Sequence, residues 1–396
     1  MAWTPTAFAA TSLATPRPSR SSGFKVTGVL AIAEGAAGVV LLLVTFYDLF
    51  QSVVLPRPAV RKVTVARAIV RPLWRVWKWV GNRGSRIDRS EARLAAFGPI
   101  ALITLFLVWA LALILGYALL IDGLGDMFRP RLDSFLTAFY VSATTLVPLS
   151  YGDFVPEEGL ARLVIILESG TGVAVAALAI TLLFELYGDF RSREEAVVAL
   201  DALAGAPPSA VQLLETAAQP EMDGALKETF DEWRRWSAMV LESHLAYPLL
   251  VYFRSSHDNE AWINSFGAVM DSASLILSST DSPAKGAAKL MFMVGNHLVE
   301  DMSWVLGLTL ATDPIIERSE YAAAIARLKA AGYKVRDGDA AWNDFAHHRS
   351  KYASALNQMA TNLLAPPAAW VGDRSYLPHR QRRPRRRRPT PAAPTT

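Results

Sequence analysis

The stretch DSFLTAFYVSATTLVPLSYGDFVP, residues 133–156, lies between two long apolar segments, residues 97–121 and 160–186. Its first half has the periodicity of an amphipathic helix, and its second half ends in Tyr-Gly-Asp at residues 151–153. The stretch is too short to cross a bilayer, because a spanning helix needs about 20 apolar residues. Irregular backbone is tolerated at membrane depth only where protein encloses it or where it lines water. The sequence therefore predicts a re-entrant pore loop here.

Three segments are long and apolar enough to span a membrane. Residues 97–121 carry no charge, residues 26–55 carry only Glu34 and Asp48, and residues 160–186 form the third segment. The 396-residue chain is 52% hydrophobic and only 19% charged, which is more apolar than an average soluble protein. We predict an all-α, multi-pass membrane protein with three transmembrane helices, a re-entrant pore helix and loop, and an all-α cytoplasmic domain.

Basic residues indicate the orientation of these spans. Residues 56–96 contain eleven Lys or Arg against two acids, Asp88 and Glu91. Short loops rich in Lys and Arg remain on the cytoplasmic side of a membrane. We therefore expect the N-terminus outside, the C-terminus in the cytoplasm, and the chain in the plasma membrane (cell inner membrane).

Part of this basic loop has a helical pattern. Arg67, Arg71, Arg75 and Lys78 share one face of a helix. A voltage sensor would place such residues along an apolar span, whereas this segment is short and contains Pro72. An interfacial helix on membrane lipid is therefore favoured, with tryptophans as anchors at the membrane surface. These tryptophans are Trp74, Trp77 and Trp79.

The order of span, pore helix, Tyr-Gly-Asp-x-x-Pro and glycine-bearing span resembles the pore module of the potassium channel family. The family's filter run is Thr-Val-Gly-Tyr-Gly-Asp, and residues 139–153 (FYVSATTLVPLSYGD) align with its pattern without a gap. The resemblance covers residues 97–187. It implies a selectivity filter of Pro148, Leu149, Ser150, Tyr151, Gly152 and Asp153, and it places Thr144 and Thr145 in the pore helix.

Three filter positions differ from the family pattern. Pro148 replaces threonine, Leu149 replaces valine, and Ser150 replaces the first glycine. Because filter carbonyls substitute for the hydration shell of the ion, a change of apolar side chain at Leu149 is mild. Pro148 lacks an amide donor, and Ser150 in a left-handed conformation would cost roughly 1–2 kcal/mol. The resemblance implies a passive channel for potassium or another monovalent cation; the alternative is a non-conducting, channel-derived membrane sensor or scaffold.

Further residues of the module have expected roles. Glu168, within the third span, is favoured as a hydrogen-bond partner behind the pore helix over an ion ligand. Gly170 and Gly172 occupy the position of the family's inner-helix hinge, although small residues also permit close helix packing. In the family, the aspartate that matches Asp153 braces the filter from behind. One loop cannot surround an ion, so the resemblance implies a homotetramer.

Residues 188–364 have the pattern of amphipathic helices. Ser209 is predicted to cap a helix, Gly332 to end one, and Pro248 to break or kink one. Ser282-Pro283 and Asp313-Pro314 are predicted helix starts. Residues 290–311 are apolar enough for a fourth span, but a buried core helix is favoured because ionisable groups lie at its centre. These groups are His297, Glu300 and Asp301.

Several functional classes lack support. The chain has no cysteine, so disulfides and thiolate metal sites are excluded, and it has no phosphate-binding glycine loop or EF-hand pattern. His244, His257 and His297 with neighbouring acids form only an incomplete metal or acid–base pattern. We therefore expect no enzyme, no catalytic residue, no metal and no cofactor.

The C-terminal tail holds seven arginines among nine residues, 380–388. Because no aromatic residues are interleaved with them, we expect anionic lipid or the helical domain as partner and no nucleic acid. The predicted division of the chain is as follows: 1–25, disordered extracellular tail; 26–55, first span; 56–96, basic cytoplasmic loop; 97–187, pore module; 188–364, helical cytoplasmic domain; 365–396, disordered tail.

Overall fold

The computed structural model describes residues 23–54, 65–81, 93–255, 261–309, 311–336 and 338–365. Three predicted features lie outside the described residues. They are residues 1–22 of the predicted N-terminal tail, residues 366–396 of the predicted C-terminal tail, and His257. The chain forms two compact units. The first, which we call the pore unit, comprises Met1–Leu49 and Leu107–Leu178; the second, the helical unit, comprises Phe50–Phe106 and Ala179–Thr396.

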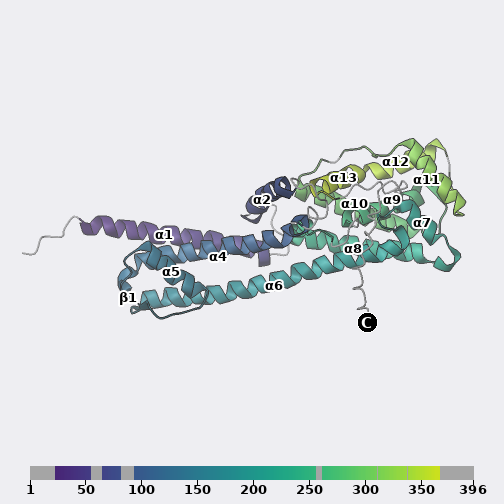
Figure 1. The fold of residues 1–396 in the computed structure, drawn as a ribbon. Coiled ribbons are helices and arrows are strands. Elements are labelled where there is room, and N and C mark those ends of the chain that lie inside the picture. Colours follow the sequence, from purple (N-terminus) through teal and green to yellow (C-terminus); the bar gives the residue numbers. More distant parts are fainter. Residues whose placement is uncertain are drawn as a thin grey trace, which may run out of the picture. The chain divides into compact units, whose positions relative to one another are not determined.

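Three helices of the described chain are long and apolar enough to cross a membrane, as predicted. They are α1 (Gly23–Leu49), α4 (Phe97–Gly123) and α6 (Gly159–Ala204), and α1 continues into a short π-helix, η1 (Phe50–Val54) (Figure 1). The shorter apolar helix α5 (Phe135–Leu146) lies between α4 and α6 in the chain, where the re-entrant helix was expected. The predicted all-α membrane architecture is confirmed.

Within the pore unit, α1 packs closely on α4 through glycines. An added Cβ on Gly38 would lie 2.6 Å from the carbonyl oxygen of Gly116, and one on Gly116 would lie 2.8 Å from Leu42 Cδ2. Small residues permit such close helix contact in membranes. The indole N–H of Trp109 in α4 donates to Asp48 of α1 at 2.8 Å, so this buried acid is hydrogen-bonded within the same chain. The first span therefore packs on its own pore unit.

A short sheet closes the loop around α5. The 3₁₀ helix η2 (Gly125–Met127) leads into β1 (Phe128–Arg129), which pairs antiparallel with β2 (Val155–Pro156). The amide of Glu157 extends this pairing by donating to the Met127 carbonyl at 2.8 Å. Phe128 is buried in the cluster that also covers one face of α5. Both ends of the loop are therefore held together.

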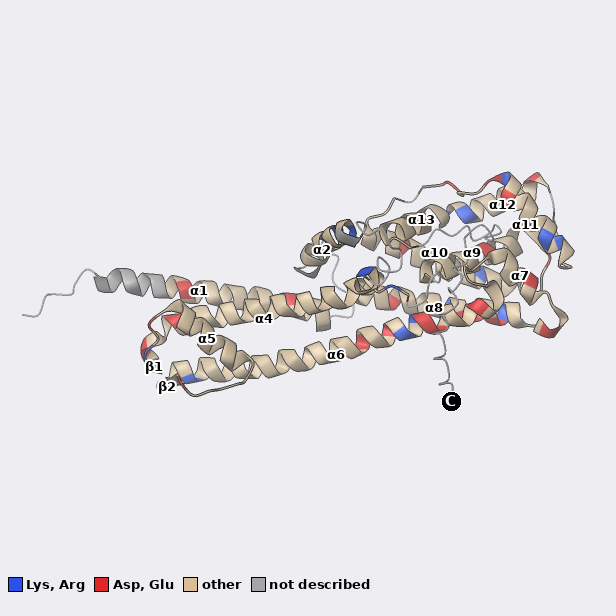
Figure 2. Cartoon of the chain, in the orientation of Figure 1, with Lys and Arg blue, Asp and Glu red and all other residues tan. Residues whose placement is uncertain are grey.

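The helix α6 contains the predicted boundary between pore module and helical domain. It continues without interruption past residues 187 and 188 to Ala204. Figure 2 shows that its charged residues gather toward the C-terminal end, beyond a long uncharged stretch. One helix thus carries both the third span and the first element of the helical domain.

The core of the helical unit contains α9 (Trp262–Ser279), in which every residue except Leu277 is buried. Helices α7, α10, α12 and α13 contact α9, and α8 packs on α10. The bounds are α2 (Val65–Gly81), α7 (Ala210–Ala217), η3 (Pro220–Met222), α8 (Ala225–Ala246), η4 (Pro248–Tyr252), α10 (Lys285–Leu306), α11 (Arg318–Ala330), α12 (Asp339–Ser350) and α13 (Ala353–Asn362).

Several predicted helix boundaries are confirmed. Ser209 caps α7 by accepting from the amide of Gln212, and Gly332 follows the end of α11 with φ +93°. Helix α8 ends at Ala246, just before Pro248. The apolar segment over residues 290–311 forms most of α10, whose inner face lies in the main core, as the buried-helix prediction expected.

Two predicted helix starts are wrong. Helix α10 begins at Lys285, two residues beyond Pro283, although the Ser282 hydroxyl accepts from the amide of Ala284. Helix α11 begins at Arg318, and no helix starts at Pro314. There the Asp313 carboxylate accepts from the amide of Ile315 and makes a local turn, while a capping box at Glu317 starts the helix.

The prediction that Trp74 anchors in the membrane surface is also wrong. Trp74 of α2 is buried among protein side chains, and its indole N–H donates to the Asn362 carbonyl at 3.2 Å. Trp77 donates to the Arg93 carbonyl at 2.9 Å, whereas Trp79 is exposed. One face of α2 therefore packs on the helical unit.

Candidate functional site

The pore helix α5 positions the start of the filter segment. Ser134 caps its N-terminus by accepting from the Thr137 amide at 3.3 Å. At its C-terminal end the Thr144 carbonyl accepts from the amide of Leu149 at 2.8 Å and from that of Ser150 at 3.4 Å. These two bonds reverse the chain directly after the helix, so Thr144 shapes the turn through its backbone carbonyl. The side chain of the neighbouring Thr145 is buried.

The filter segment has a distinctive backbone. Ser150 and Gly152, two positions apart, have φ of +44° and +79°. Ser150 therefore adopts the left-handed conformation that glycine would tolerate without penalty, at a cost of roughly 1–2 kcal/mol. All residues from Pro148 to Asp153 are exposed in the single chain, with Leu149 at 51% and Tyr151 at 66%. The six predicted filter residues thus form one uncovered, sharply turned segment.

An aromatic contact joins the end of this segment to the pore helix. The Tyr140 ring makes an edge contact with Phe154 at 6.4 Å between centroids. Phe154, which directly follows Asp153, thus links the end of the filter segment to α5.

Glu168 lies at a junction of three helices. It is completely buried in the pore unit, and its Oε1 lies 2.5 Å from the Ser142 hydroxyl of α5. The same hydroxyl lies 2.9 Å from the Ile114 carbonyl of α4. Glu168 Oε2 makes no hydrogen bond to any described residue. A side chain enclosed in this way connects α6 to α5, and through the Ser142 hydroxyl to α4, and it has no access to solvent in the single chain.

The two inner-helix glycines have different surroundings. An added Cβ on Gly172 would lie 1.8 Å from the carbonyl oxygen of Leu146, at the end of the pore helix. No atom of the described chain would lie within 4 Å of a Cβ on Gly170. Gly172 therefore permits close packing of α6 on α5, whereas Gly170 lies on an exposed face.

Arg193 of α6 is a residue that sequence reasoning missed. It is buried, it donates to the carbonyls of Leu250 at 3.1 Å and Phe253 at 2.6 Å, and it pairs with Glu194 at 3.0 Å. The indole of Trp236 donates to the Arg193 carbonyl at 3.1 Å. An arginine so enclosed fastens α6 to the segment at η4. The sequence signal is its register: it continues the buried strip of α6 that includes Leu182 and Leu186.

His244 of α8 completes this contact. Its Nδ1 lies 2.9 Å from the Val240 carbonyl and its Nε2 lies 3.2 Å from the Arg193 guanidinium. Burial, helped by the positive charge of Arg193, lowers the pKa of His244 to about 3. A neutral imidazole that donates from Nδ1 and accepts at Nε2 satisfies both contacts.

Phe253 is a second residue that the sequence did not single out as a contact between helices. Its ring lies 5.8 Å from those of Tyr187 and Phe190 in α6, centroid to centroid. On its other side an added Cβ on Gly98 of α4 would approach Phe253 Cδ2 to 2.8 Å. Phe253 is therefore inserted between the first turn of α4 and the C-terminal half of α6.

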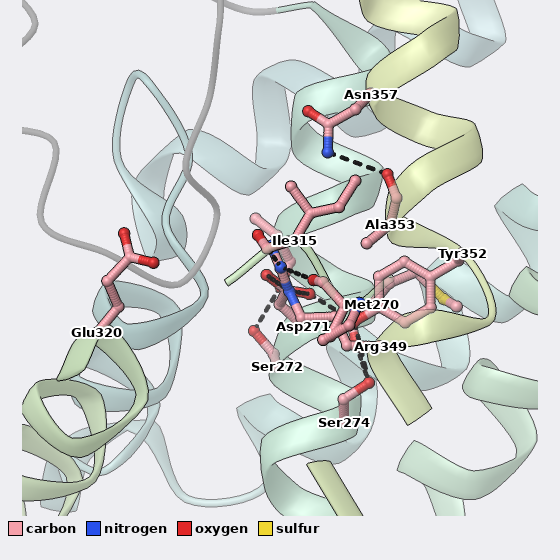
Figure 3. A network of polar contacts seen from close by, with 12 residues as sticks. Met270, Asp271, Ser272, Ser274, Ile315, Glu320, Arg349, Tyr352, Ala353 and Asn357 are labelled. Carbon is pink, nitrogen blue, oxygen red and sulfur yellow. Dashed lines mark hydrogen bonds and ion pairs between the residues drawn. The ribbon is translucent and has the colours of Figure 1, made fainter. Parts of the chain in front are cut away.

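A separate polar cluster lies in the core of the helical unit (Figure 3). Arg349 donates to both oxygens of Asp271 at 3.0 and 3.2 Å, and the Tyr352 hydroxyl donates to Asp271 at 2.5 Å. Arg349 also donates to the carbonyls of Pro314 and Ile315, and Ile315 has φ +49°. The cluster holds the connection before α11 in place, which accounts for the absence of a helix start at Pro314.

Among the described residues, no group of three or more His, Asp or Glu side chains could hold a metal ion. The predicted half-motif on α10 forms only a pair, with His297 Nε2 3.2 Å from Asp301, and both side chains are partly exposed. Glu300 accepts instead from the Asn296 amide at 2.7 Å.

Comparison with known proteins supports the pore interpretation of this site. Over 61 residues the chain is 41% identical to the voltage-gated potassium channel Kch of Escherichia coli (strain K12), and the match covers 15% of each chain. The chain therefore spans only about 15% of the length of this curated relative. No solved structure gives a significant match. Residues 102–189 match the family described as "Ion channel", which is not an enzyme family, so this segment is an ion channel pore domain.

Proposed function

We propose that the chain is one subunit of a passive channel for potassium or another monovalent cation, with a filter formed by the backbone of residues 148–152. The observation that carries this proposal is the filter backbone, which turns on the Thr144 carbonyl and has two left-handed residues two positions apart. Backbone carbonyls turned toward one axis can replace the hydration shell of a cation. In this proposal Asp153, which directly follows the filter, braces its outer end from behind.

The functional unit in this proposal is a homotetramer. A single loop cannot enclose an ion, and the filter residues are left uncovered by their own chain. In α6, only 6% of the most apolar window is buried within the chain, against 39% in α4. Three further copies around a four-fold axis would line the pore with α6 and surround the ion with four filter segments.

The pore would open and close at the point where α6 leaves the membrane. Arg193 fastens α6 to the segment at η4, and Phe253 separates the start of α4 from α6. A rearrangement of the helical domain would therefore move α6 relative to α4. The eleven basic residues of positions 56–96 support an orientation with the helical domain and C-terminus in the cytoplasm and the N-terminus outside, in the plasma membrane.

The second candidate is a non-conducting membrane sensor or scaffold derived from a channel. The strained backbone at Ser150 and the missing amide donor at Pro148 favour it. The discriminating experiment is current across a planar bilayer with purified full-length protein, potassium on one side and sodium on the other.

A reversal potential near the potassium value supports a selective filter, and one near zero supports a non-selective pore. Absence of current in the wild type and in the P148T/L149V/S150G variant, with the tetramer intact, would overturn the channel proposal. Current that appears only in the variant would support the non-conducting candidate for the natural chain.

A further inference from the structure

The helix α2 is basic along its whole length. Its 17 residues include no Asp or Glu. Arg71, Arg75 and Lys78 supply positive charge among the residues whose side chains are described. This distribution leaves α2 with no acid of its own to neutralise these groups.

One face of α2 is attached to the rest of the helical unit. The Trp74 ring lies 4.7 Å from Phe97 and 5.5 Å from Tyr252, centroid to centroid. Arg71 donates weakly to the Val305 carbonyl at 3.3 Å, and Val70 is buried in the same cluster. These contacts fix which face of α2 remains uncovered.

The uncovered face has one basic edge and one apolar edge. At 100° per residue, Arg71 and Arg75 lie on one side of the exposed arc and Val76 lies on the other, with Trp79 between them. Val76 and Trp79 are each 59% exposed. A helix with Trp and an aliphatic residue beside arginines suits the boundary between headgroups and acyl chains.

The position of α2 along the chain's membrane-crossing axis follows from its contact with Phe97. Phe97 is the first residue of α4, a helix whose next 24 residues carry no charge. Trp74 packs directly on Phe97, so α2 lies where this span leaves the hydrocarbon. At this level along α4, the medium beside the chain is the polar headgroup region of the bilayer.

We propose that the exposed arc of α2 binds anionic phospholipid headgroups, with Arg71 and Arg75 on the phosphates and Val76 and Trp79 against the upper acyl chains. A zwitterionic surface offers the same apolar contact without the net charge, so the basic edge selects anionic lipid.

A bound headgroup at α2 is connected to the inner helix by direct contacts. Trp74 packs on Tyr252 of η4, and the carbonyl of Leu250 in the same η4 accepts from Arg193 of α6. The adjacent Phe253 carbonyl accepts from the same guanidinium. Anionic lipid would thereby stabilise one arrangement of η4 on α6. This second effect rests on the proposed channel function, whereas lipid binding itself does not.

The test measures lipid binding to the full-length protein by native mass spectrometry, with phosphatidylglycerol titrated against phosphatidylcholine. R71Q/R75Q should weaken phosphatidylglycerol binding about 30-fold, since each arginine near an anionic surface contributes about fivefold. The matched control K285Q/K289Q removes two positive charges from α10 and should leave binding unchanged. Phosphatidylcholine binding should be the same in all three proteins.

A second measurement reports on the arc itself. Brominated phosphatidylglycerol should quench tryptophan fluorescence more in the wild type than in W79F, and brominated phosphatidylcholine should show a smaller difference. Soluble glycerol phosphate should not reverse the quenching, because it lacks the acyl chains that Val76 and Trp79 contact.

Three results would overturn the proposal. They are equal affinity of the wild type for both lipids, equal weakening by R71Q/R75Q and the control, and a loss of oligomeric mass in R71Q/R75Q without any change in lipid binding. The last result would assign the arc to a neighbouring copy of the chain. None of these readouts requires ion current, so failure here is distinct from failure of the channel proposal.

Discussion

At the scale of single residues, the contact between Gly172 and Leu146 sets how close α6 lies to the pore helix. A methyl group at Gly172 would lie 1.8 Å from a backbone oxygen that cannot rotate away. Any side chain at residue 172 must push α6 away from Leu146 at the end of α5. The turn into the filter segment begins at this end of α5, so its distance from α6 would change too.

We predict that G172A lowers the free energy of unfolding by at least about 1–3 kcal/mol, the usual cost of overpacking a filled site. The matched variant G170A, where no described atom lies within 4 Å, should be neutral or gain up to about 1 kcal/mol of helix propensity. Thermal unfolding of the purified full chain in detergent checks both. Equal midpoints for the two variants would contradict the close contact.

The hydrogen bond between Ser142 and Glu168 makes a second prediction at this scale. S142A removes the only described hydrogen-bond partner of a buried carboxyl group and should destabilise the protein by about 1–3 kcal/mol. S142A/E168L replaces both polar groups with apolar ones and should recover most of that loss. A double-mutant cycle in thermal unfolding measures the coupling; additive effects would show that the two side chains act independently.

At the scale of elements, the segment around η4 connects three helices that are distant in sequence. It contacts α2 through Tyr252, α4 through Phe253 and α6 through the bonds of Arg193. Because Arg193 is buried, its removal leaves two carbonyl groups and Glu194 without their main partner. Breaking a buried charged contact in this way is more costly than losing an exposed one.

We expect R193M to lower the free energy of unfolding by about 3–5 kcal/mol, the range for removal of one partner of a buried ion pair. R191M, two residues before Arg193 on the same helix, is the control and should change stability by less than about 0.5 kcal/mol, because Arg191 is exposed. The two variants can be compared by their midpoints of thermal unfolding. Similar losses in both would contradict the role of Arg193 as an attachment point.

His244 gives this junction a pH dependence. Its pKa is lowered from 6.5 to about 3 in the folded protein because the imidazole is buried beside Arg193. Between these two values the unfolded chain binds a proton that the folded chain does not, so stability falls as the pH is lowered from about 6.5 toward 3.

In H244Q the loss of stability at low pH that is due to residue 244 should disappear. Glutamine does not titrate, but it can still donate to the Val240 carbonyl and accept from Arg193. The measurement is the difference in unfolding midpoint between wild type and H244Q across this pH range. The difference should grow in favour of H244Q as the pH falls. Parallel pH profiles would show that His244 is not buried in its neutral form.

At the scale of the whole molecule, the proposed homotetramer would cover the surface of α6 and of the filter segment that the single chain leaves exposed. Native mass spectrometry of the purified protein should give four chains of 43.2 kDa each. The variant V173E places a charge in the uncharged part of α6. It should reduce the fraction of tetramer, because Val173 is 58% exposed in the single chain. A monomer in the wild type, with unchanged secondary structure, would contradict the proposed assembly.

The number of candidate spans and the place of the short apolar helix α5 between two of them could be predicted from the sequence. A long uncharged run such as residues 97–121 can satisfy its backbone hydrogen bonds in a membrane without neighbouring segments only as a helix. The expected strain at Ser150 also follows from local chemistry, since its φ of +44° suits glycine better. Such features depend on residues that are close in sequence and on the solvent around them.

The tertiary structure decided what Trp74, Arg193 and Phe253 contact. Sequence pattern predicted Trp74 at the membrane surface, but the ring is buried against Phe97 and Tyr252, which are remote in the chain. Arg193 lies in a run of charged residues; its register on α6 indicates a buried face but does not identify its partners, the carbonyls of Leu250 and Phe253. Periodicity indicates which face of a helix is apolar, but it does not indicate which distant segment covers that face. The sequence pattern therefore determined the membrane architecture, whereas only the folded chain decided how the helical domain is attached.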